Sequence, residues 1–266
     1  MSKTKPRGFA KNEGRWLVIA AWPPELAYLD AGLLDLPAQV RQRVVLASVG
    51  VGMVEAGIAT AQLLARNQPD LVLLVGTAGV YPGQPLALDQ AAIAQRVRLL
   101  PQILPGKHAY LPTIVPTEVK ASASLVRSLR KAAHLPYADV ACPIGITATK
   151  QAAVAAGKLS GCALENLEAF AVARAAALAK VPFAAVLGVA NHVGPNGHRE
   201  WERHAKSAAE NACRAVVAFF TDYGPHVTLP PAGSSPALSA RSKSTSIARH
   251  ASGAMARVSS LAYMPK

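Results

Sequence analysis

Short apolar runs alternate with longer amphipathic stretches through the middle of the chain. The apolar runs predict strands over residues 16–21, 43–49, 70–76, 88–99, 142–148 and 183–190. The stretches with apolar residues at helical spacing predict helices over residues 52–67, 119–133, 149–158, 166–180 and 201–222. Strands that alternate with helices are typical of a mostly parallel or mixed sheet covered on both faces. The pattern therefore predicts an α/β fold, a three-layer α/β/α sandwich around a central mixed sheet.

The two ends of the chain differ in composition from its middle. Residues 1–14 are basic and polar, and residues 225–266 are rich in Pro, Ser, Ala and Arg, so neither segment has much apolar surface to bury. We expect a flexible N-terminus over residues 1–14, one domain over 15–224 and a disordered tail over 225–266. The first apolar run ends in two prolines without a small-residue cleavage site, which favours a buried strand over a signal peptide.

Charge and cysteine content exclude several classes of protein. The formal net charge is +13, of which residues 1–15 carry +4 and residues 225–266 carry +5, leaving +4 on the remainder. The basic ends therefore attract nucleic acid at most weakly and do not define a basic face. The longest apolar runs are about half the ~20 residues of a membrane span. Three cysteines without disulfide or zinc spacing indicate a reducing cytoplasm, and we expect no metal or cofactor.

Two glycine-containing segments follow predicted strands. Gly50-Val-Gly52 lies between a strand and a helix, where free N–H groups bind anions or hydroxyls, although its spacing does not match a dinucleotide fingerprint. Gly76-Thr-Ala-Gly79 ends the strand 70–76, leaves room for a ligand at the backbone and offers the Thr77 hydroxyl. Each segment is also compatible with a tight turn that needs positive φ. Because the carboxyl ends of adjacent parallel strands share a crevice, the pair together predicts a binding site.

Polar residues at the ends of predicted elements are further candidates. Glu25 follows the first strand, and Glu168 begins an otherwise apolar helix; each is either a helix-dipole partner or a carboxylate that faces a ligand. Asn191 and His192 end the last predicted strand. His192 and His198 could ligate a metal, but no carboxylate or cysteine lies at ligand spacing, which argues against a metal site.

Taken together, these segments resemble the purine nucleoside phosphorylase and nucleosidase superfamily over about residues 16–222. The segments, in the family's order, are Ile19-Ala-Ala-Trp-Pro-Pro-Glu25, Ser48-Val-Gly-Val-Gly-Met-Val-Glu-Ala56, Gly76-Thr-Ala-Gly79, Glu165-Asn-Leu-Glu168 leading to Val181-Pro-Phe183, and Val189-Ala-Asn191. The run from Asn191 to Trp201 is most similar to the futalosine hydrolases, nucleosidases of an alternative menaquinone route. The resemblance implies a nucleoside phosphorylase/hydrolase-like fold, a purine nucleoside as the small-molecule partner, and a homo-oligomer.

The resemblance also implies roles for single residues. Glu25 would activate the attacking water, Glu168 would hold the ribose hydroxyls beside Leu167, and Asn191 would bind the N7/O6 edge of the purine. The remaining expected substrate-binding residues are Gly52, Thr77, Gly79 and His192. Cleavage of an N-glycosidic bond passes through an oxocarbenium-like sugar, which a carboxylate stabilises. An Asn amide can donate to one ring atom and accept from another, which suits a 6-oxopurine, whereas adenine-type nucleosidases carry Asp at this position.

The nucleophile depends on whether phosphate can bind. Phosphorylases of the superfamily usually present an Arg at the position of Leu74, and a leucine cannot hold a dianion. Water is therefore the favoured nucleophile. Three alternatives stay open: a phosphate-dependent purine nucleoside phosphorylase, a methylthioadenosine/S-adenosylhomocysteine nucleosidase, and a non-catalytic protein that binds nucleosides or nucleic acid.

Overall fold

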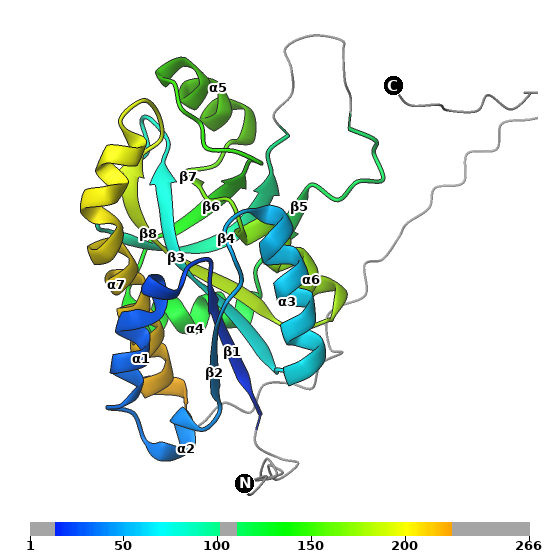
Figure 1. Ribbon diagram of the computed structural model, residues 1–266, viewed down its shortest axis with the longest axis vertical. Helices are drawn as coiled ribbons and strands as arrows, with labels where there is room; N and C mark the ends of the chain where they lie inside the picture. Colours follow the sequence, from blue (N-terminus) through cyan, green and yellow to red (C-terminus); the bar gives the residue numbers. More distant parts are fainter. Residues whose placement is uncertain (1–13, 102–110, 225–266) are drawn as a thin grey trace, which may run out of the picture. The chain divides into compact units, whose positions relative to one another are not determined.

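The computed structural model describes residues 14–101 and 111–224, which form an eight-stranded mixed sheet with helices on both faces (Figure 1). The strands are β1 (Trp16–Ala20), β2 (Val44–Ser48), β3 (Leu71–Val80), β4 (Ala91–Leu99), β5 (Glu118–Lys120), β6 (Tyr137–Cys142), β7 (Leu164–Glu165) and β8 (Phe183–His192). They pair in the order β2-β1-β3-β7-β6-β4-β5, and β8 pairs with both β3 and β4.

Two groups of parallel strands meet in this sheet. Strands β1, β2, β3 and β8 run in one direction, and β4, β6 and β7 run in the other. The groups are antiparallel where β3 meets β7 and where β8 meets β4, so the pairings β3–β8–β4–β6–β7–β3 close a ring. The ring brings the segment that follows β7 beside the carboxyl ends of β3 and β8.

The helices divide between the two faces of the sheet. Helices α1 (Ala27–Leu33), α2 (Ala38–Arg41), α4 (Ala123–Ala133) and α7 (Gly197–Tyr223) cover one face, and α3 (Met53–Asn67) and α6 (Ala169–Leu178) cover the other. Helix α5 (Lys150–Ser160) packs on a third, smaller cluster. A 3-10 helix, η1 (Pro23–Leu26), follows β1. Successive side chains of a strand point to opposite faces, so on β1 Leu17 faces the α3 side and Trp16 the α7 side.

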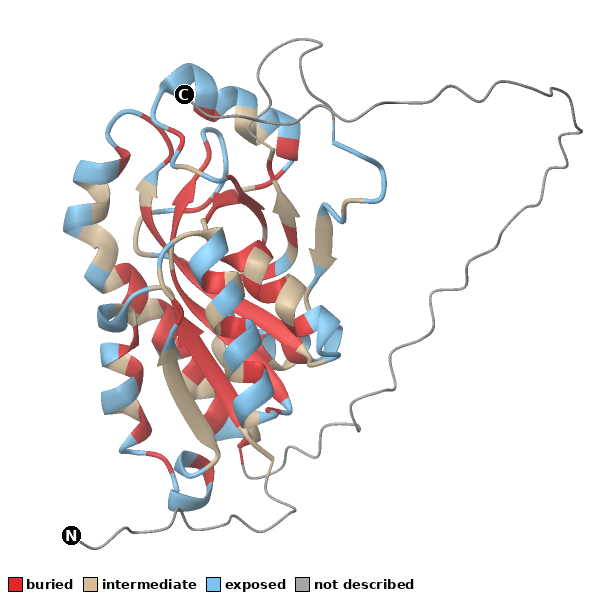
Figure 2. Ribbon diagram, turned by 45° about the vertical axis from the view of Figure 1, so that its right-hand side comes forward, coloured by how far each residue is buried: buried red, intermediate tan, exposed pale blue. Residues whose placement is uncertain are grey.

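Strand β8 lies at the centre of the fold, and Figure 2 shows the central strands as buried. All of its residues from Phe183 to Ala190 are buried, as expected for a continuous apolar run covered on both faces. At Gly188 a Cβ atom would lie 2.0 Å from the carbonyl oxygen of Ala208, so glycine is needed for α7 to pack directly on the strand. This close packing determines where the N-terminal end of α7 lies.

The predicted α/β sandwich with a central mixed sheet is confirmed, but one predicted strand is wrong. Residues 143–148 form a loop, and β6 occupies Tyr137–Cys142 instead of residues 142–148. Asp139 interrupts the apolar character of the true strand, and its charge is compensated by Arg96 on the neighbouring strand β4. Strand β5 and strand β7 were not predicted.

Two helices begin four residues away from their predicted starts, and α1 and α2 were not predicted. Helix α4 begins at Ala123, because residues 118–120 pair with β4 as strand β5. Helix α7 begins at Gly197, four residues before the predicted start. Of the predicted flexible N-terminus 1–14, residues 1–13 lie outside the described residues, as does the predicted tail 225–266. Within residues 14–101 and 111–224, no helix combines the length and the apolar character needed to cross a membrane.

Candidate active site

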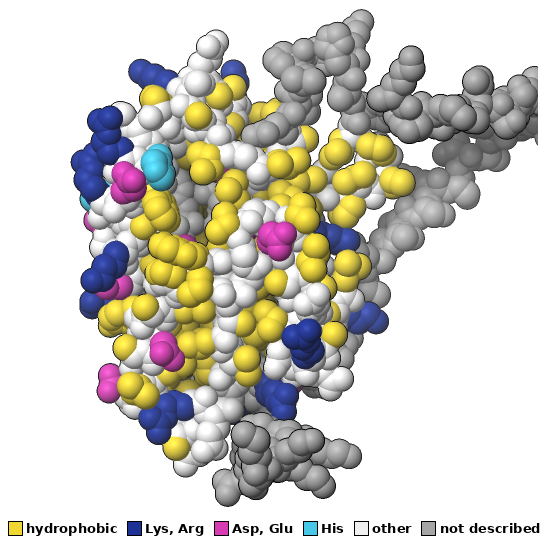
Figure 3. Space-filling view, in the orientation of Figure 1, with side chains coloured by type: hydrophobic (Ala, Val, Ile, Leu, Met, Phe, Trp, Pro, Cys, Tyr) yellow, Lys and Arg dark blue, Asp and Glu magenta, His cyan; other side chains and the backbone are white. Residues whose placement is uncertain are grey.

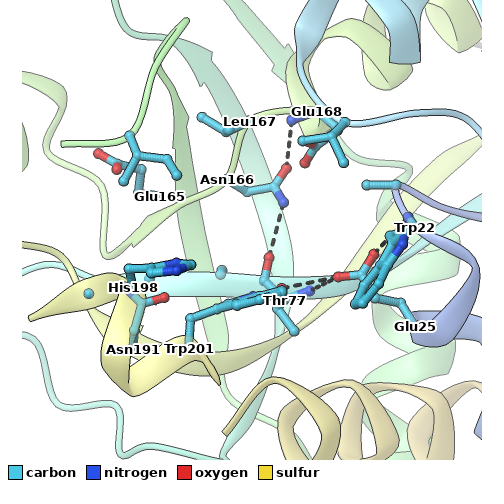
Figure 4. Close-up of a pocket in the computed structure, with 16 residues that line it drawn as sticks. Trp22, Glu25, Thr77, Glu165, Asn166, Leu167, Glu168, Asn191, His198 and Trp201 are labelled. Carbon is cyan, nitrogen blue, oxygen red and sulfur yellow. Dashed lines mark hydrogen bonds between the residues drawn. The ribbon is translucent and has the colours of Figure 1, made fainter. Parts of the chain in front are cut away.

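A cavity of about 420 Å³ lies where the carboxyl ends of β1, β3 and β8 come together (Figure 4). Its walls come from the β1–η1 connection, β3, the segment after β7, the end of β8 and the first turns of α7. The lining residues are Ala21, Trp22, Glu25, Val51, Thr77, Ala78, Gly79, Ile146, Glu165, Asn166, Leu167, Glu168, Asn191, Gly197, His198 and Trp201. An apolar cavity with a few convergent polar groups is typical of a small-molecule site.

The Glu25 carboxyl group is held by three N–H and O–H donors. Its Oε1 accepts from the backbone N–H and the hydroxyl of Thr77, each at 3.0 Å, and its Oε2 accepts from the Trp22 N–H at 3.2 Å. Burial raises the pKa of Glu25, the hydrogen bonds from Trp22 and Thr77 oppose this, and the charge of Glu168 adds to the rise. A carboxyl group with a raised pKa in a cavity is suited to exchange a proton with a reacting group.

Gly76-Thr-Ala-Gly79 does not end the strand, which corrects the sequence-based interpretation. Strand β3 continues to Val80, and neither glycine has positive φ. Glycine is needed here for close approach instead. A Cβ at Gly76 would lie 3.1 Å from Glu25 Oε1, and a Cβ at Gly79 would lie 2.9 Å from Asn191 Nδ2. Each glycine therefore leaves space for one polar side chain of the cavity.

Glu168, at the start of α6, caps the N-terminus of helix α3 on the same face of the sheet. Gly52, the N-cap residue of α3, has φ of 91° and donates its N–H to Glu168 Oε1 at 2.7 Å. A carboxylate is favoured at this position by the helix dipole. Burial raises the pKa of Glu168, and the Gly52 hydrogen bond opposes the rise. The Gly52 N–H that was expected to bind substrate thus binds this carboxylate, which itself lines the cavity.

Asn166 connects the two carboxylate-bearing regions. Its Nδ2 donates to the Thr77 carbonyl oxygen at 3.1 Å, and its Oδ1 accepts from the backbone N–H groups of Glu168 and Ala169 at 3.0 and 2.8 Å. The side chain caps α6 and at the same time attaches α6 to β3. The Asn166 amide therefore helps to fix Glu168 relative to Glu25, which is bonded to Thr77.

Asn191 reaches the cavity because of a β-bulge. Ala78 pairs with Val189 and Gly79 with Asn191, so Ala190 is an extra residue in β8. Bulges next to active sites change the direction in which side chains point. The Asn191 amide donates to the His192 carbonyl oxygen at 3.0 Å, which holds the amide plane and leaves its other N–H and its oxygen for a ligand.

Six of the eight predicted site residues line the cavity, and His192 and Gly52 do not. The six are Glu25, Thr77, Gly79, Leu167, Glu168 and Asn191. His192 follows Asn191 in the strand, and its side chain is 59% exposed and lies 3.0 Å from Glu200 Oε2. Burial by itself would raise the pKa of Glu200, but the hydrogen bonds from His192 outweigh it and hold this pKa below its usual range. Sequence reasoning placed His192 by its position along the strand and could not detect the change of direction.

Sequence reasoning missed the aromatic wall of the cavity. Trp22 and Trp201 have ring centroids 6.1 Å apart, and His198 stacks on Trp201 at 6.2 Å with an interplanar angle of 10°. In the sequence, Trp201 contributes only to the resemblance of the run from Asn191 to the futalosine hydrolases. The signal was its position four residues into α7, on the side that faces β3.

Buried hydrogen bonds around Glu165 support another wall of the cavity. Glu165 accepts hydrogen bonds from the Tyr81 hydroxyl at 2.6 Å and from the hydroxyl and N–H of Thr147 at 2.6 and 3.0 Å. Burial and the Glu165 hydrogen bond raise the pKa of Tyr81, so the phenol stays protonated and donates. Thr147 belongs to the loop that carries Ile146 into the cavity. Neither Thr147 nor Tyr81 was singled out from the sequence.

No Lys or Arg is present among the described residues that line the cavity. Leu74, at the position where phosphorylases of the resembled superfamily carry an Arg, is 2% exposed and packs in the core on the face of the sheet that α3 covers.

Figure 3, in the orientation of Figure 1, shows apolar side chains exposed on the surface of the molecule. Val51, Val54 and Ile58 are 61%, 72% and 55% exposed, and Val51 also lines the cavity.

Comparison with protein families agrees with the fold and the motifs. The profile of the phosphorylase superfamily matches residues 38–221, which is more than half of the 266-residue chain. The chain therefore belongs to this superfamily, and the resemblance inferred from the five sequence segments is confirmed at that level. Glu25 precedes the matched region, so its assignment depends on the geometry of the cavity.

The chain is similar in sequence to two nucleosidases. A futalosine hydrolase from Thermus thermophilus is 28% identical over 183 residues, which cover 64% of this chain and 79% of the relative. A 5′-methylthioadenosine/S-adenosylhomocysteine nucleosidase from Psychromonas ingrahamii is 27% identical over 216 residues, covering 73% and 93%. The native structure of futalosine hydrolase from Helicobacter pylori has a TM-score of 0.70 at 12% identity over 79% of this chain and 98% of that one, a likeness of fold.

Proposed function

We propose that the protein hydrolyses the N-glycosidic bond of a purine nucleoside, in the manner of a futalosine hydrolase, with a 6-oxopurine as leaving group. One observation carries the proposal: the carboxyl groups of Glu25 and Glu168 and the amide of Asn191 converge on one apolar cavity at the carboxyl ends of β3 and β8. Its similarity to a futalosine hydrolase at 28% identity supports the same substrate class.

Each of the three side chains suits one part of this reaction. Glu25, with its raised pKa and fixed orientation, accepts a proton from the attacking water. Glu168 accepts hydrogen bonds from the sugar hydroxyls and stabilises the positive charge that develops on the sugar. Asn191 donates its amide N–H to the N7/O6 edge of a 6-oxopurine as the base gains electron density. The residues between them, Leu167 and Gly79, offer space and an apolar surface.

Water is favoured over phosphate as the nucleophile. A phosphate dianion needs a cationic clamp, usually a bidentate Arg. The lining of the cavity, as far as it is described, contains no such group, and Leu74 is in the core. These observations support hydrolysis. The alternative is a phosphate-dependent phosphorylase, which base release with and without phosphate tests.

Base release from three nucleosides tests the proposal. The protein is incubated with inosine, futalosine and methylthioadenosine, with and without phosphate, and the free base and the sugar product are quantified by chromatography. We expect base release without phosphate, with the free sugar and no sugar phosphate as co-product. Release that strictly requires phosphate would assign a phosphorylase instead. Absence of release from all three would favour the non-catalytic binding alternative.

The second candidate is a methylthioadenosine/S-adenosylhomocysteine nucleosidase, which is favoured by the relative matched over 93% of its own length. Replacing Asn191 by Asp discriminates between the candidates. The wild type is expected to prefer inosine over adenosine, and the N191D variant is expected to shift the ratio of the two kcat/KM values towards adenosine by about ten- to a hundredfold. A mispaired buried polar group costs about 1–3 kcal/mol, and about 1.4 kcal/mol corresponds to a factor of ten. An unchanged ratio would contradict the role of Asn191 in binding the base.

The homo-oligomer and the cytoplasmic location stay predictions. The exposed apolar residues Val51, Val54 and Ile58 support the first, because a second copy that covered them would also close the cavity beside Val51. Participation in a menaquinone route also stays a prediction, as does weak attraction of nucleic acid to the basic ends.

A further inference from the structure

A chain of two hydrogen bonds leads from helix α7 to the Glu25 carboxyl group. Trp201 Nε1 lies 3.2 Å from Thr77 Oγ1, and the same oxygen lies 3.0 Å from Glu25 Oε1. The contacts join residues that are 124 and 52 positions apart in the sequence. Figure 4 shows the three side chains side by side along one wall of the cavity.

The direction of each of these two hydrogen bonds follows from which group has a proton to donate. An indole N–H can only donate, whereas a hydroxyl group has one proton and two lone pairs. Trp201 therefore occupies a lone pair of the Thr77 hydroxyl, and the single hydroxyl proton points to Glu25. With the Thr77 backbone N–H, Glu25 Oε1 receives two donors, which favours the ionised carboxylate and fixes its plane.

We infer that Trp201 is a positioning residue for Glu25, acting through the direction of the Thr77 hydroxyl. The inference rests on the proposed function, in which Glu25 accepts a proton from water. Without the indole N–H, the hydroxyl is free to rotate and to donate to other acceptors in the cavity. Glu25 then loses part of the stabilisation that opposes its burial. Because a phenylalanine ring preserves the aromatic wall, the loss of the N–H can be separated from the loss of the ring.

The other titratable groups near Glu25 do not produce this effect. Glu168 from the start of α6 raises the pKa of Glu25 through its charge. Cys213 from α7 donates its thiol to the Glu25 main-chain carbonyl oxygen at 3.2 Å, and burial raises its pKa to about 12, so it stays neutral. Cys213 does not line the cavity, and His198 is the titratable residue of α7 that does. For this reason the titration of Glu25 must be observed directly and not only through activity.

The test combines the pH dependence of kcat/KM for inosine with direct titration of Glu25. The carboxyl carbons of glutamate are labelled with ¹³C, and the Glu25 resonance is assigned by its absence in E25Q. In W201F we expect the Glu25 midpoint and the acidic limb of the pH profile to move upward together by about 0.5–1 pH unit, the size of one lost hydrogen bond. At neutral pH kcat is expected to fall about three- to tenfold with little change in KM.

Matched variants isolate the chain of hydrogen bonds. W22F also removes an indole N–H from the aromatic wall, but it keeps the Trp22 backbone donor to Glu25; whatever its effect on KM, the midpoint is expected to stay in place. T77V removes the hydroxyl and is expected to move the midpoint at least as far as W201F. The double variant of W201F and T77V should move it no further than T77V alone. T77S restores the hydroxyl and with it the sensitivity to W201F.

Three outcomes would overturn the inference: an unmoved Glu25 midpoint in W201F, an equal movement in W22F, or additive movements in the double variant. Failure of the proposed function looks different. If no variant and no wild-type protein releases base, the ¹³C titration still reports whether Trp201 controls the ionisation of Glu25. If base is released but the midpoint does not move, the proposed function stands and the inference fails. Thermal unfolding of each variant confirms that the comparison is made between folded proteins.

Discussion

Replacing Glu25 by Gln is expected to lower kcat for base release from inosine by about 10²–10⁴-fold, the usual contribution of a general base. Glutamine has the same shape, and its amide oxygen can still accept from the Thr77 or Trp22 N–H groups, so the midpoint of thermal unfolding should change little. The variant loses the ability to take a proton from water and retains the cavity. Steady-state kinetics with inosine, together with thermal unfolding, measure both effects.

The role of Glu25 as a base also predicts how kcat/KM changes with pH. A general base works only when it is deprotonated, so kcat/KM is expected to be high above the pKa of Glu25 and to fall as the pH decreases through it. Because burial raises this pKa, the fall should occur above the ordinary range of a carboxyl group, and E25Q should lack it. E55Q, which changes an exposed glutamate of α3, is the control. Retention of activity within about threefold in E25Q would contradict its role as the base.

Replacing Glu168 by Gln is expected to lower kcat/KM by about 10²–10³-fold, mostly in kcat. The carboxylate stabilises positive charge that exists only in the transition state, and removal of one such electrostatic group typically has this size. Glutamine can keep the hydrogen bond from the Gly52 N–H, so the variant tests charge without leaving a buried donor unpaired. Kinetics with inosine measure the loss, and circular dichroism on heating measures the stability.

A second substrate shows whether Glu168 also contacts the sugar hydroxyls. With 2′-deoxyinosine the hydroxyl partner is missing, so the effect of E168Q is expected to be smaller than with inosine. The difference between the two losses is the coupling energy of the carboxylate with the hydroxyl, as in a double-mutant cycle. Equal losses on both substrates would contradict a contact with the 2′-hydroxyl, and a wild-type value of kcat would contradict any role in the transition state.

The glycine-containing segments illustrate what periodicity and residue type can predict. Gly50 and Gly52 have positive φ, as the turn interpretation required, and α3 begins directly after them. Gly76 and Gly79 were placed at the correct edge of the sheet, with close approach to the backbone and a tight turn as the two interpretations, and the turn is wrong. A glycine is demanded both by positive φ and by close approach of another side chain. Only the positions of Glu25 and Asn191 distinguish the two demands.

The error at residues 142–148 has a related cause. The segment reads as apolar from Cys142 to Ile146, whereas the true strand contains Asp139. An acid in a half-buried strand is costly unless it is paired, and its partner Arg96 is 43 residues away on β4. The local sequence shows that a charge would have to be buried, but it does not show the distant residue that pairs with it.

The sequence by itself determined the alternation of strands and helices, and with it the edge of the sheet where Glu25, Glu168 and Asn191 occur. These are properties of neighbouring residues, because the side-chain period and the turn residues are local. Only the tertiary structure decided that the bulge at Ala190 points Asn191 into the cavity and leaves His192 outside. It also decided that Trp201 reaches Thr77. Both depend on how β8 pairs with β3 and how α7 docks on Gly188, and such contacts between distant segments are set by packing rather than by any local pattern.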